Sequence, residues 1–330
     1  MNATAMSSIP ALQILSLLAL AACGSAGSKA PNSSVSLAES AIFGEPPAPS
    51  IAPSATIQVL TEEDVRYHTL GFFGEGIPAH IVESPSGVVL VDLSQGDGTE
   101  VELRAYVDAI GKPMSVIITH GHFDHWLGAS AFTDIDLYAS TGVATALESS
   151  VGNTAGFTDI YASGVNAVDG SVTLAGFNFE VHDVPSTETD EVGYITLPDQ
   201  QAIFSGDLAT GKSHEYLREY TPNDGRDELD TWLSALESMK SNYSGYRYIF
   251  YGHHGYSTDV AGSFDGAIDY VSTGQALIKG TQPLSDGGTA TSVQQVVDEL
   301  LVLYPAHHDG GLYFALPDAF YPGDPGAEWF

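Results

Sequence analysis

Basic residues are scarce in this sequence, which has 10 Lys and Arg against 42 Asp and Glu and a formal net charge of −32 at pH 7. A surface of that sign repels the phosphate backbone, so we expect no nucleic-acid partner. Cysteine is almost absent, because Cys23 is the only one among 330 residues. The region that follows Cys23 therefore has no disulfide, no cysteine nucleophile and no thiolate ligand for a metal.

Apolar runs long enough to span a bilayer are lacking as well. Residues 9–22 are almost all apolar and fit the hydrophobic region of a signal peptide. This run ends in Leu20-Ala21-Ala22-Cys23, which resembles the lipobox of bacterial lipoproteins, where the signal is cleaved before a cysteine that becomes lipidated. No Lys or Arg precedes the run, so an ordinary signal peptide cleaved nearby is the alternative. We expect an exported protein, a periplasmic or cell-surface lipoprotein with its lipid anchor in a membrane.

The chain after Cys23 falls into two parts. Up to residue 55 it is rich in Ser, Ala, Pro and Gly, which is typical of a semi-flexible tether. Apolar alternation begins after that point, and 43% hydrophobic residues are enough for a large core. We predict a signal peptide over residues 1–22, a lipidated cysteine with its tether over 23–55, and one folded domain over 56–330.

Periodic apolar patterns in this domain predict strands and helices in alternating groups. Strand clusters that are followed by helices occur twice, which predicts two packed sheets with helices outside. The predicted helices cover residues 99–110, 142–150, 228–240, 264–278 and 291–303. The predicted strands cover residues 57–60, 67–73, 80–83, 88–91, 115–118, 137–139, 193–197, 202–204 and 248–251, with a hairpin over 172–184 that turns at Gly176.

Three histidines and an aspartate are concentrated in His120-Gly121-His122-Phe123-Asp124-His125, directly after the apolar strand predicted at 115–118. Imidazole and carboxylate groups are ligands that Zn²⁺, iron and manganese favour. In a tight turn after a strand, alternate residues can point toward one metal and the next two toward a neighbouring metal. The alternative is a histidine cluster on the surface of an acidic protein.

This His-x-His-x-Asp-His pattern resembles the hallmark of the metallo-β-lactamase-fold superfamily, whose members have a four-layer αβ/βα sandwich of the α/β (α+β) class. The similarity continues in order from about Tyr67 to Gly255. It implies that Asp92, after the strand residues Leu90-Val91, supports the metal loop, and that Asp207 bridges two metals. It also implies that His253 is the last ligand of the second metal, with His254 as the close alternative.

One segment departs from the family pattern. Most members have a Gly-His-Thr segment ahead of the bridging carboxylate, and the corresponding position of this chain is Glu188. A carboxylate binds Zn²⁺ at the same distance as an imidazole, about 2.0–2.2 Å, so Glu188 can replace the histidine at the first metal. This Thr-Glu arrangement locally resembles the alkylsulfatase branch, whose members are longer and have extra domains. The alternative is that Glu188 only lines the pocket.

The resemblance implies a metal-dependent hydrolase in which two divalent ions, zinc first and iron or manganese otherwise, activate a water to hydroxide. Asp124 would also orient this nucleophile or pass a proton to the leaving group. The expected small-molecule substrate is a lactone, a carboxylic ester or a sulfate ester. His214 and Tyr256 are candidates for substrate contact. The implied metal ligands are His120, His122, Asp124, His125, Glu188, Asp207 and His253.

Three other functions fit parts of the pattern. A β-lactamase would suit an exported protein, but the third histidine of the first metal and a cysteine in the site are missing. A di-iron redox protein would commonly have a glutamate in place of His122 and a partner domain for electron transfer, and this chain has neither. A metal-binding surface lipoprotein without catalytic activity would share all of these ligands.

Overall fold

Two β-sheets form the centre of the structure, which is a computed structural model of the chain. It describes residues 43–44, 48–51, 53–72, 76–149, 154, 156–185, 187, 189, 191–215, 217 and 228–308. These residues lie within one unit, residues 37–330, that is defined by its internal contacts. The position of each candidate ligand follows from how these two sheets are built.

The first sheet has the spatial order β1-β2-β3-β4-β5-β6-β7. Strands β1 to β4 are antiparallel to their neighbours, whereas β4 to β7 run parallel. Parallel neighbours bring their carboxyl ends to the same edge of the sheet, and β4 and β5 do so here. The strands are β1 (Thr56–Thr61), β2 (Arg66–Phe72), β3 (Ile77–Glu83), β4 (Val88–Val91), β5 (Met114–Ile117), β6 (Leu137–Ser140) and β7 (Asn166–Val168).

The second sheet has the spatial order β13-β12-β11-β10-β9-β8. Its neighbours are antiparallel except for β11 and β12, which are parallel and therefore also end at one edge. The strands are β8 (Gly170–Leu174), β9 (Phe177–Pro185), β10 (Glu191–Leu197), β11 (Ala202–Phe204), β12 (Tyr248–Phe250) and β13 (Tyr256–Ser257).

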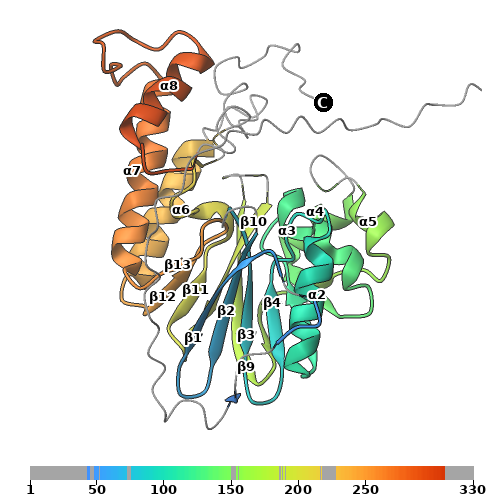
Figure 1. Ribbon diagram of the computed structural model, residues 1–330. Helices are drawn as coiled ribbons and strands as arrows, with labels where there is room; N and C mark the ends of the chain where they lie inside the picture. The colour runs from blue at the N-terminus through green and yellow to red at the C-terminus, as the bar shows by residue number, and fades with distance from the viewer. Residues whose placement is uncertain are drawn as a thin grey trace, which may run out of the picture. The chain divides into compact units, whose positions relative to one another are not determined.

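Helices cover the outer face of each sheet, as Figure 1 shows. Buried side chains of α2, α4 and α5 share one hydrophobic cluster with the first sheet, and those of α6, α7 and α8 share another with the second. The layers are therefore helices, sheet, sheet and helices. The helices are α2 (Thr99–Ile110), α3 (Phe123–Trp126), η1 (Leu127–Ala131), α4 (Thr141–Ser149), α5 (Phe157–Ile160), η3 (Gly206–Leu208), α6 (Glu228–Tyr243), α7 (Val260–Ile278) and α8 (Val293–Leu303).

The apolar strands are buried on both faces. In β4, Val88 and Leu90 pack toward the helices, while Val89 and Val91 pack between the two sheets. Side chains of β11 and β12 likewise alternate between the helices that cover the second sheet and the space between the two sheets. Side chains of a strand point to opposite faces in turn, so a continuous apolar run is what two covered faces require. Each fully buried side chain of this kind contributes roughly 1.5–3 kcal/mol. The predicted four-layer αβ/βα sandwich is confirmed.

The two sheets approach each other closely at the edge where β5, β11 and β12 end. The backbone N–H of Gly193, in β10, donates to the carbonyl of Thr119 at 2.6 Å, and His120 forms an isolated bridge with Val192. The backbone N–H of Gly252, after β12, donates to the carbonyl of Gly206 at 3.0 Å. These bonds bring the loops after three strands, from both sheets, into one region.

Candidate metal centre

The loop after β5 and the start of α3 together contain four of the predicted ligands. His122 has extended backbone, with φ −67° and ψ 139°, and α3 begins directly after it. Asp124 and His125 therefore lie on a helical turn, where successive side chains diverge by about 100°. The buried indole N–H of Trp126 donates at 2.8 Å to the carbonyl of the glycine between the first two histidines. This bond holds the loop closed. The side chains of His120 and His122 belong to one group of donor atoms, and those of Asp124 and His125 belong to another.

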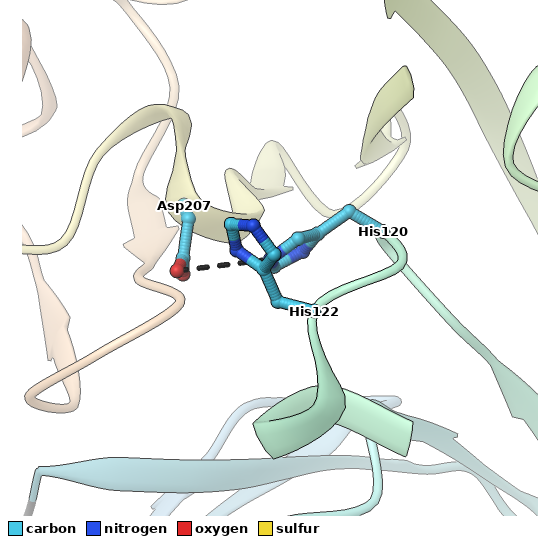
Figure 2. Close-up of side chains that lie close together, drawn as sticks. All are labelled: His120, His122 and Asp207. Carbon is cyan, nitrogen blue, oxygen red and sulfur yellow. Dashed lines mark ion pairs between the residues drawn. The ribbon is translucent and has the colours of Figure 1, made fainter. Parts of the chain in front are cut away.

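Asp207 and His253 reach the same region from the second sheet. Asp207 lies in η3, just after β11, and His253 lies just after β12. Six side chains thereby form two groups, in each of which the donor atoms all lie within 4.8 Å of one another. Figure 2 shows the first group, with the carboxylate facing the two rings. The groups are His120, His122 and Asp207, and Asp124, His125 and His253.

The carboxylate of Asp207 lies between the two groups. Its Oδ2 is 3.7 Å from Nε2 of His120 and 3.1 Å from Nε2 of His253, and its Oδ1 is 3.4 Å from Nε2 of His125. Asp124 Oδ2 is 3.5 Å from Nε2 of His253. Two ligands that are each about 2.1 Å from a tetrahedral cation are about 3.4 Å from each other. The observed separations are therefore those expected of neighbouring metal ligands.

Unsatisfied buried atoms also indicate that cations fit here. Among the residues that the structure describes, Oδ1 of Asp207 and Nε2 of His125 are buried and lie 3.4 Å from each other without the geometry of a hydrogen bond. Each such atom costs about 1–3 kcal/mol unless something else satisfies it. Gly252 leaves room beside this carboxylate, because a Cβ atom there would lie 1.8 Å from Oδ1 of Asp207. Imidazole and carboxylate donors at this spacing fit divalent cations such as Zn²⁺.

Hydrogen bonds behind the ligands fix the tautomers of two imidazoles. Asp92 accepts from the backbone N–H and the hydroxyl of Thr119, each at 2.8 Å, and from Nδ1–H of His125 at 2.9 Å. Because Thr119 donates its only hydroxyl proton to Asp92, its oxygen accepts from Nδ1–H of His120 at 3.0 Å. Both imidazoles then keep the lone pair of Nε2 for the site.

The charges of the centre are coupled. Burial alone would raise the pKa of Asp207, but the imidazoles of His253, His125 and His120 hold this pKa well below its usual range. Burial lowers the pKa of His253, and Asp207 more than offsets this and raises it to about 9. Nδ1–H of His253 donates to the carbonyl of Gly76. A cation that binds Nε2 of His253 must therefore displace a second proton from this ring.

Two of the positions considered as ligands in the sequence are not among the grouped donors of the described residues. Glu188 lies outside the described residues, so its role as a ligand stays a prediction. His254 does not belong to either group of donors that the described residues form. Its ring instead stacks on His308, with centroids 4.1 Å apart. Of the two histidines that the sequence left open, His253 is the one that faces Asp207.

The two candidates for substrate contact, His214 and Tyr256, are among the described residues. His214 is buried, and its Nδ1 is 2.9 Å from the hydroxyl of Tyr270 in α7. Tyr256 is half-buried in β13, and its ring packs on Phe250 with centroids 5.5 Å apart. Neither belongs to the two groups of donors among the described residues. Their contact with a substrate stays a prediction.

Sequence reasoning missed Thr119 and Gly76. Thr119 bonds both Asp92 and His120, and a signal for it was available, because a hydroxyl residue joins the buried strand to the histidine-rich loop. Gly76 acts through its backbone carbonyl, which every residue has, so its type gave no signal. The centre thus includes supporting groups that only the folded chain reveals.

Both the sequence and the structure are similar to those of known proteins. The sequence matches the family described as the metallo-beta-lactamase superfamily over residues 74–253. A search of curated proteins finds no match. The structure resembles a metallo-beta-lactamase from Pontibacter korlensis, with 21% identity, TM-score 0.48, and coverage of 66% of this chain and 99% of that one. It also resembles DIM-1 metallo-beta-lactamase exposed to ceftazidime, with 21% identity, TM-score 0.50, and coverage of 68% and 99%.

A third similar structure is that of VMB-1, with 15% identity, TM-score 0.51, and coverage of 67% of this chain and 98% of that one. At such identities, structural similarity indicates a shared fold only. The family match is the stronger finding, because it covers more than half of the 330 residues and includes all six grouped donors. The chain belongs to the metallo-β-lactamase superfamily.

Proposed function

We propose that this protein is a hydrolase that uses two divalent cations, zinc first among them, on a lactone, a carboxylic ester or a sulfate ester. The observation that supports this most directly is the position of Asp207, whose two oxygens face different histidines. Divalent cations at such a centre lower the pKa of a water and polarise the bond to be broken. One carboxylate between two groups of donors is suited to hold two cations close together.

The residues of the chain have distinct tasks in this proposal. His120 and His122 hold one cation with Asp207, and Asp124, His125 and His253 hold the other. Asp124 exposes 19% of its side chain, whereas His125 exposes 1%. An exposed carboxylate can reach a substrate, so Asp124 orients the nucleophile or passes a proton to the leaving group. Asp92 keeps His125 in the required tautomer.

Glu188 completes the first cation site in this proposal. Each group has two imidazoles and one carboxylate, and Asp207 gives the second group a fourth donor, because its oxygens are 3.4 Å from Nε2 of His125 and 3.1 Å from Nε2 of His253. A fourth ligand is therefore needed on the first side to reach the usual tetrahedral number. The local similarity to the alkylsulfatase branch favours a sulfate ester as one of the substrates. Glu188→Gln should lower the metal content by about one ion, and an unchanged content would contradict this role.

Metal analysis combined with a substrate panel tests the function. The panel consists of γ-nonalactone, 4-nitrophenyl acetate, 4-nitrophenyl sulfate, sodium dodecyl sulfate and nitrocefin, so that a β-lactamase is also tested. The double variant His120→Ala, His122→Ala should lose metal and lower turnover by roughly 10³-fold or more. His182→Ala is the control, because that ring stacks on Tyr194 and His182 belongs to neither group of donors among the described residues.

The outcomes separate the candidate functions. Unchanged turnover in the double variant would rule out hydrolysis at this centre. Bound metal without turnover on any member of the panel would favour a metal-binding lipoprotein over a hydrolase. Cleavage of nitrocefin alone would make the protein a β-lactamase and remove the lactone and ester proposals.

We also propose that the protein is exported and lipidated at Cys23. The support is the lipobox-like segment that ends at this cysteine. Within the part of the chain that the structure describes, no helix has the length and apolar character needed to cross a membrane. Labelling of cells with a radioactive fatty acid should mark the wild-type chain but not Cys23→Ser. Equal labelling of the two would contradict the proposal.

A further inference from the structure

A second group of histidines lies beside the metal centre. His254 directly follows the proposed ligand His253, and its ring stacks on His308, with centroids 4.1 Å apart and planes 13° from parallel. The backbone N–H of His308 donates to the carbonyl of Lys212 at 2.8 Å, and its carbonyl accepts from the N–H of His214 at 3.3 Å. Segments that follow β11, β12 and α8 therefore meet here.

His254 has a backbone conformation that side chains rarely adopt. Its φ is 59°, in the left-handed region where glycine is favoured. The turn is closed by a hydrogen bond of 3.0 Å from the N–H of Tyr251 to the carbonyl of Gly255. That bond does not involve the side chain at position 254, so glycine would suit the backbone at least as well. A strained non-glycine residue next to a candidate ligand raises the hypothesis that its side chain has a function.

Attachment of the segment after α8 does not depend on the stacked pair. Its backbone makes the two hydrogen bonds given above. The ring of His307 also lies parallel to that of Tyr270, with centroids 5.5 Å apart. His308 itself is exposed, and His254 is half-buried. The attachment of the segment is thus provided by its backbone and His307, and His308 remains an exposed residue.

His254 directly follows His253, which is one of the more exposed residues of the metal centre. Asp124 and His253 expose 19% and 17% of their side chains, whereas His125 exposes 1%. A small molecule therefore reaches the centre from the side of Asp124 and His253. The stacked rings thus begin one residue beyond this exposed part of the centre.

We propose that the stacked rings of His254 and His308 bind a planar group of the substrate, the aromatic acyl or aryloxy part of an ester or lactone. This inference rests on the proposed function and names a class of substrate for it. Aromatic rings attract one another in offset-stacked or edge-to-face arrangements, and an imidazole pair supplies both a face and polar edges. The interaction needs no charge from the protein, which suits a chain with a net charge of −32.

Binding of two carboxylates to the Co²⁺-loaded protein tests this inference. Phenylacetate and acetate have the same group for the cations, but only phenylacetate has a ring. Titrations monitored by the visible Co²⁺ spectrum should show that the wild type binds phenylacetate about tenfold more tightly than acetate. In both His254→Gly and His308→Ala the ratio of the two affinities should fall about fivefold, because phenylacetate binds more weakly while the affinity for acetate is unchanged.

Metal content and melting temperature separate this role from a structural one. His254→Gly should keep its metal and melt at the same or a higher temperature, because glycine relieves the strained φ. His307→Ala is the matched control, which should melt at a lower temperature and keep the preference for phenylacetate. Loss of metal in His254→Gly would instead assign this residue to the support of the ligand turn and overturn the proposal.

The titration decides the inference whether or not the hydrolase assay succeeds. Equal preference for phenylacetate in the wild type and both variants, or no preference in the wild type, would overturn it. Failure of the proposed function would appear separately, as metal-loaded protein without turnover on the panel. If the wild type cleaves 4-nitrophenyl phenylacetate, His254→Gly should raise KM about fivefold with little change in kcat.

Discussion

Two clusters of ionisable side chains are buried in this protein, one around Glu83 and one around Asp207. Glu83 lies at the end of β3 and accepts from Nζ of Lys112 at 2.7 Å, Nε2–H of His68 at 2.9 Å and Nη1 of Arg66 at 3.4 Å. Both of its oxygens have partners, and basic side chains of the same chain balance its charge. Asp207 is equally buried, but its Oδ1 has no hydrogen-bond partner among the described residues.

The two clusters also differ in how their imidazoles are bonded. Around Glu83, His68 uses both ring nitrogens, because its Nδ1 is 2.8 Å from the hydroxyl of Tyr106. Around Asp207, the imidazoles of His120 and His125 are oriented from behind and leave Nε2 toward the site. A satisfied cluster stabilises the fold by itself. In the cluster around Asp207, Oδ1 of this residue lacks a hydrogen bond and lies among donor atoms that could hold a cation.

The largest expected effect comes from removing the charge of Asp207. Asp207→Asn leaves one oxygen and an amide between the two groups of donors, and an amide N–H₂ cannot bind a cation. We expect less than one bound metal per chain and a loss of kcat/KM of roughly 10³-fold or more. Mass-spectrometric metal analysis and assays on the active member of the panel measure both. Full metal content in this variant would contradict the bridging position of Asp207.

Glu83→Gln should give the opposite pattern, namely a loss of stability with the metal unchanged. Removing one partner of a buried ion pair leaves the other charge uncompensated, which costs about 3 kcal/mol of unfolding free energy. Urea unfolding measures this loss, and metal analysis should still find the wild-type content. Glu180→Gln is the control, because Glu180 exposes 42% of its side chain and should change stability by less than about 0.5 kcal/mol. A loss of metal in Glu83→Gln would make the two clusters interdependent.

Local signals were sufficient to predict much of the fold from the sequence. The predicted strand 88–91 and helix 99–110 have the same bounds as β4 and α2. The predicted hairpin turns at Ala175 and Gly176, whose φ angles of 51° and 85° suit a two-residue turn. Helix α7 begins at Val260, earlier than the predicted 264–278. The Asp259 side chain caps it by accepting from the N–H of Gly262 at 3.0 Å, and that glycine concealed the first turn.

The sequence predicted the metal ligands of the histidine-rich loop more fully than the residues that other segments bring next to them. The residues of one short loop, from His120 to His125, are neighbours in any fold, so their types alone indicate a metal site. Whether His253 or His254 faces Asp207 depends on the turn after β12, which the order of residues does not determine. The contact of His254 with His308 joins distant segments without a motif at His308, and only the tertiary structure reveals it.

The stability of the fold should fall at acid pH because of His80, a buried histidine whose two ring nitrogens are both hydrogen-bonded. Nε2–H of His80 donates to the carbonyl of Tyr251 at 2.8 Å, and its Nδ1 accepts from the hydroxyl of Thr69 at 3.0 Å. Burial lowers the pKa of His80 from 6.5 to about 4. Since the folded pKa lies below the unfolded value, stability is complete above pH 6.5 and is lost as the pH falls toward 4. His80 thus resembles the Glu83 cluster in its bonding.

The pH dependence of unfolding measures this effect. Between pH 6.5 and 5, His80 should account for a loss of about 2 kcal/mol, because one unit of pKa shift corresponds to 1.36 kcal/mol. Urea unfolding of the chelator-treated wild type and of His80→Gln at both pH values isolates the contribution, since glutamine does not titrate. The wild type should lose about 2 kcal/mol more than the variant. Equal losses would show that His80 is not the group responsible.

The smallest effect should come from the bonds behind the ligands. Thr119→Val keeps the shape of the side chain but removes the hydroxyl that donates to Asp92 and accepts from His120. The imidazole of His120 is then free to adopt the other tautomer, and metal affinity should fall about tenfold. Competition with a chromophoric chelator measures the affinity. Thr119→Ser should restore it, and Thr145→Val, at an exposed threonine of α4, should leave it unchanged. If Thr119→Val binds metal as tightly as the wild type, these bonds do not orient the ligands, and the contrast with the Glu83 cluster depends on Asp207 alone.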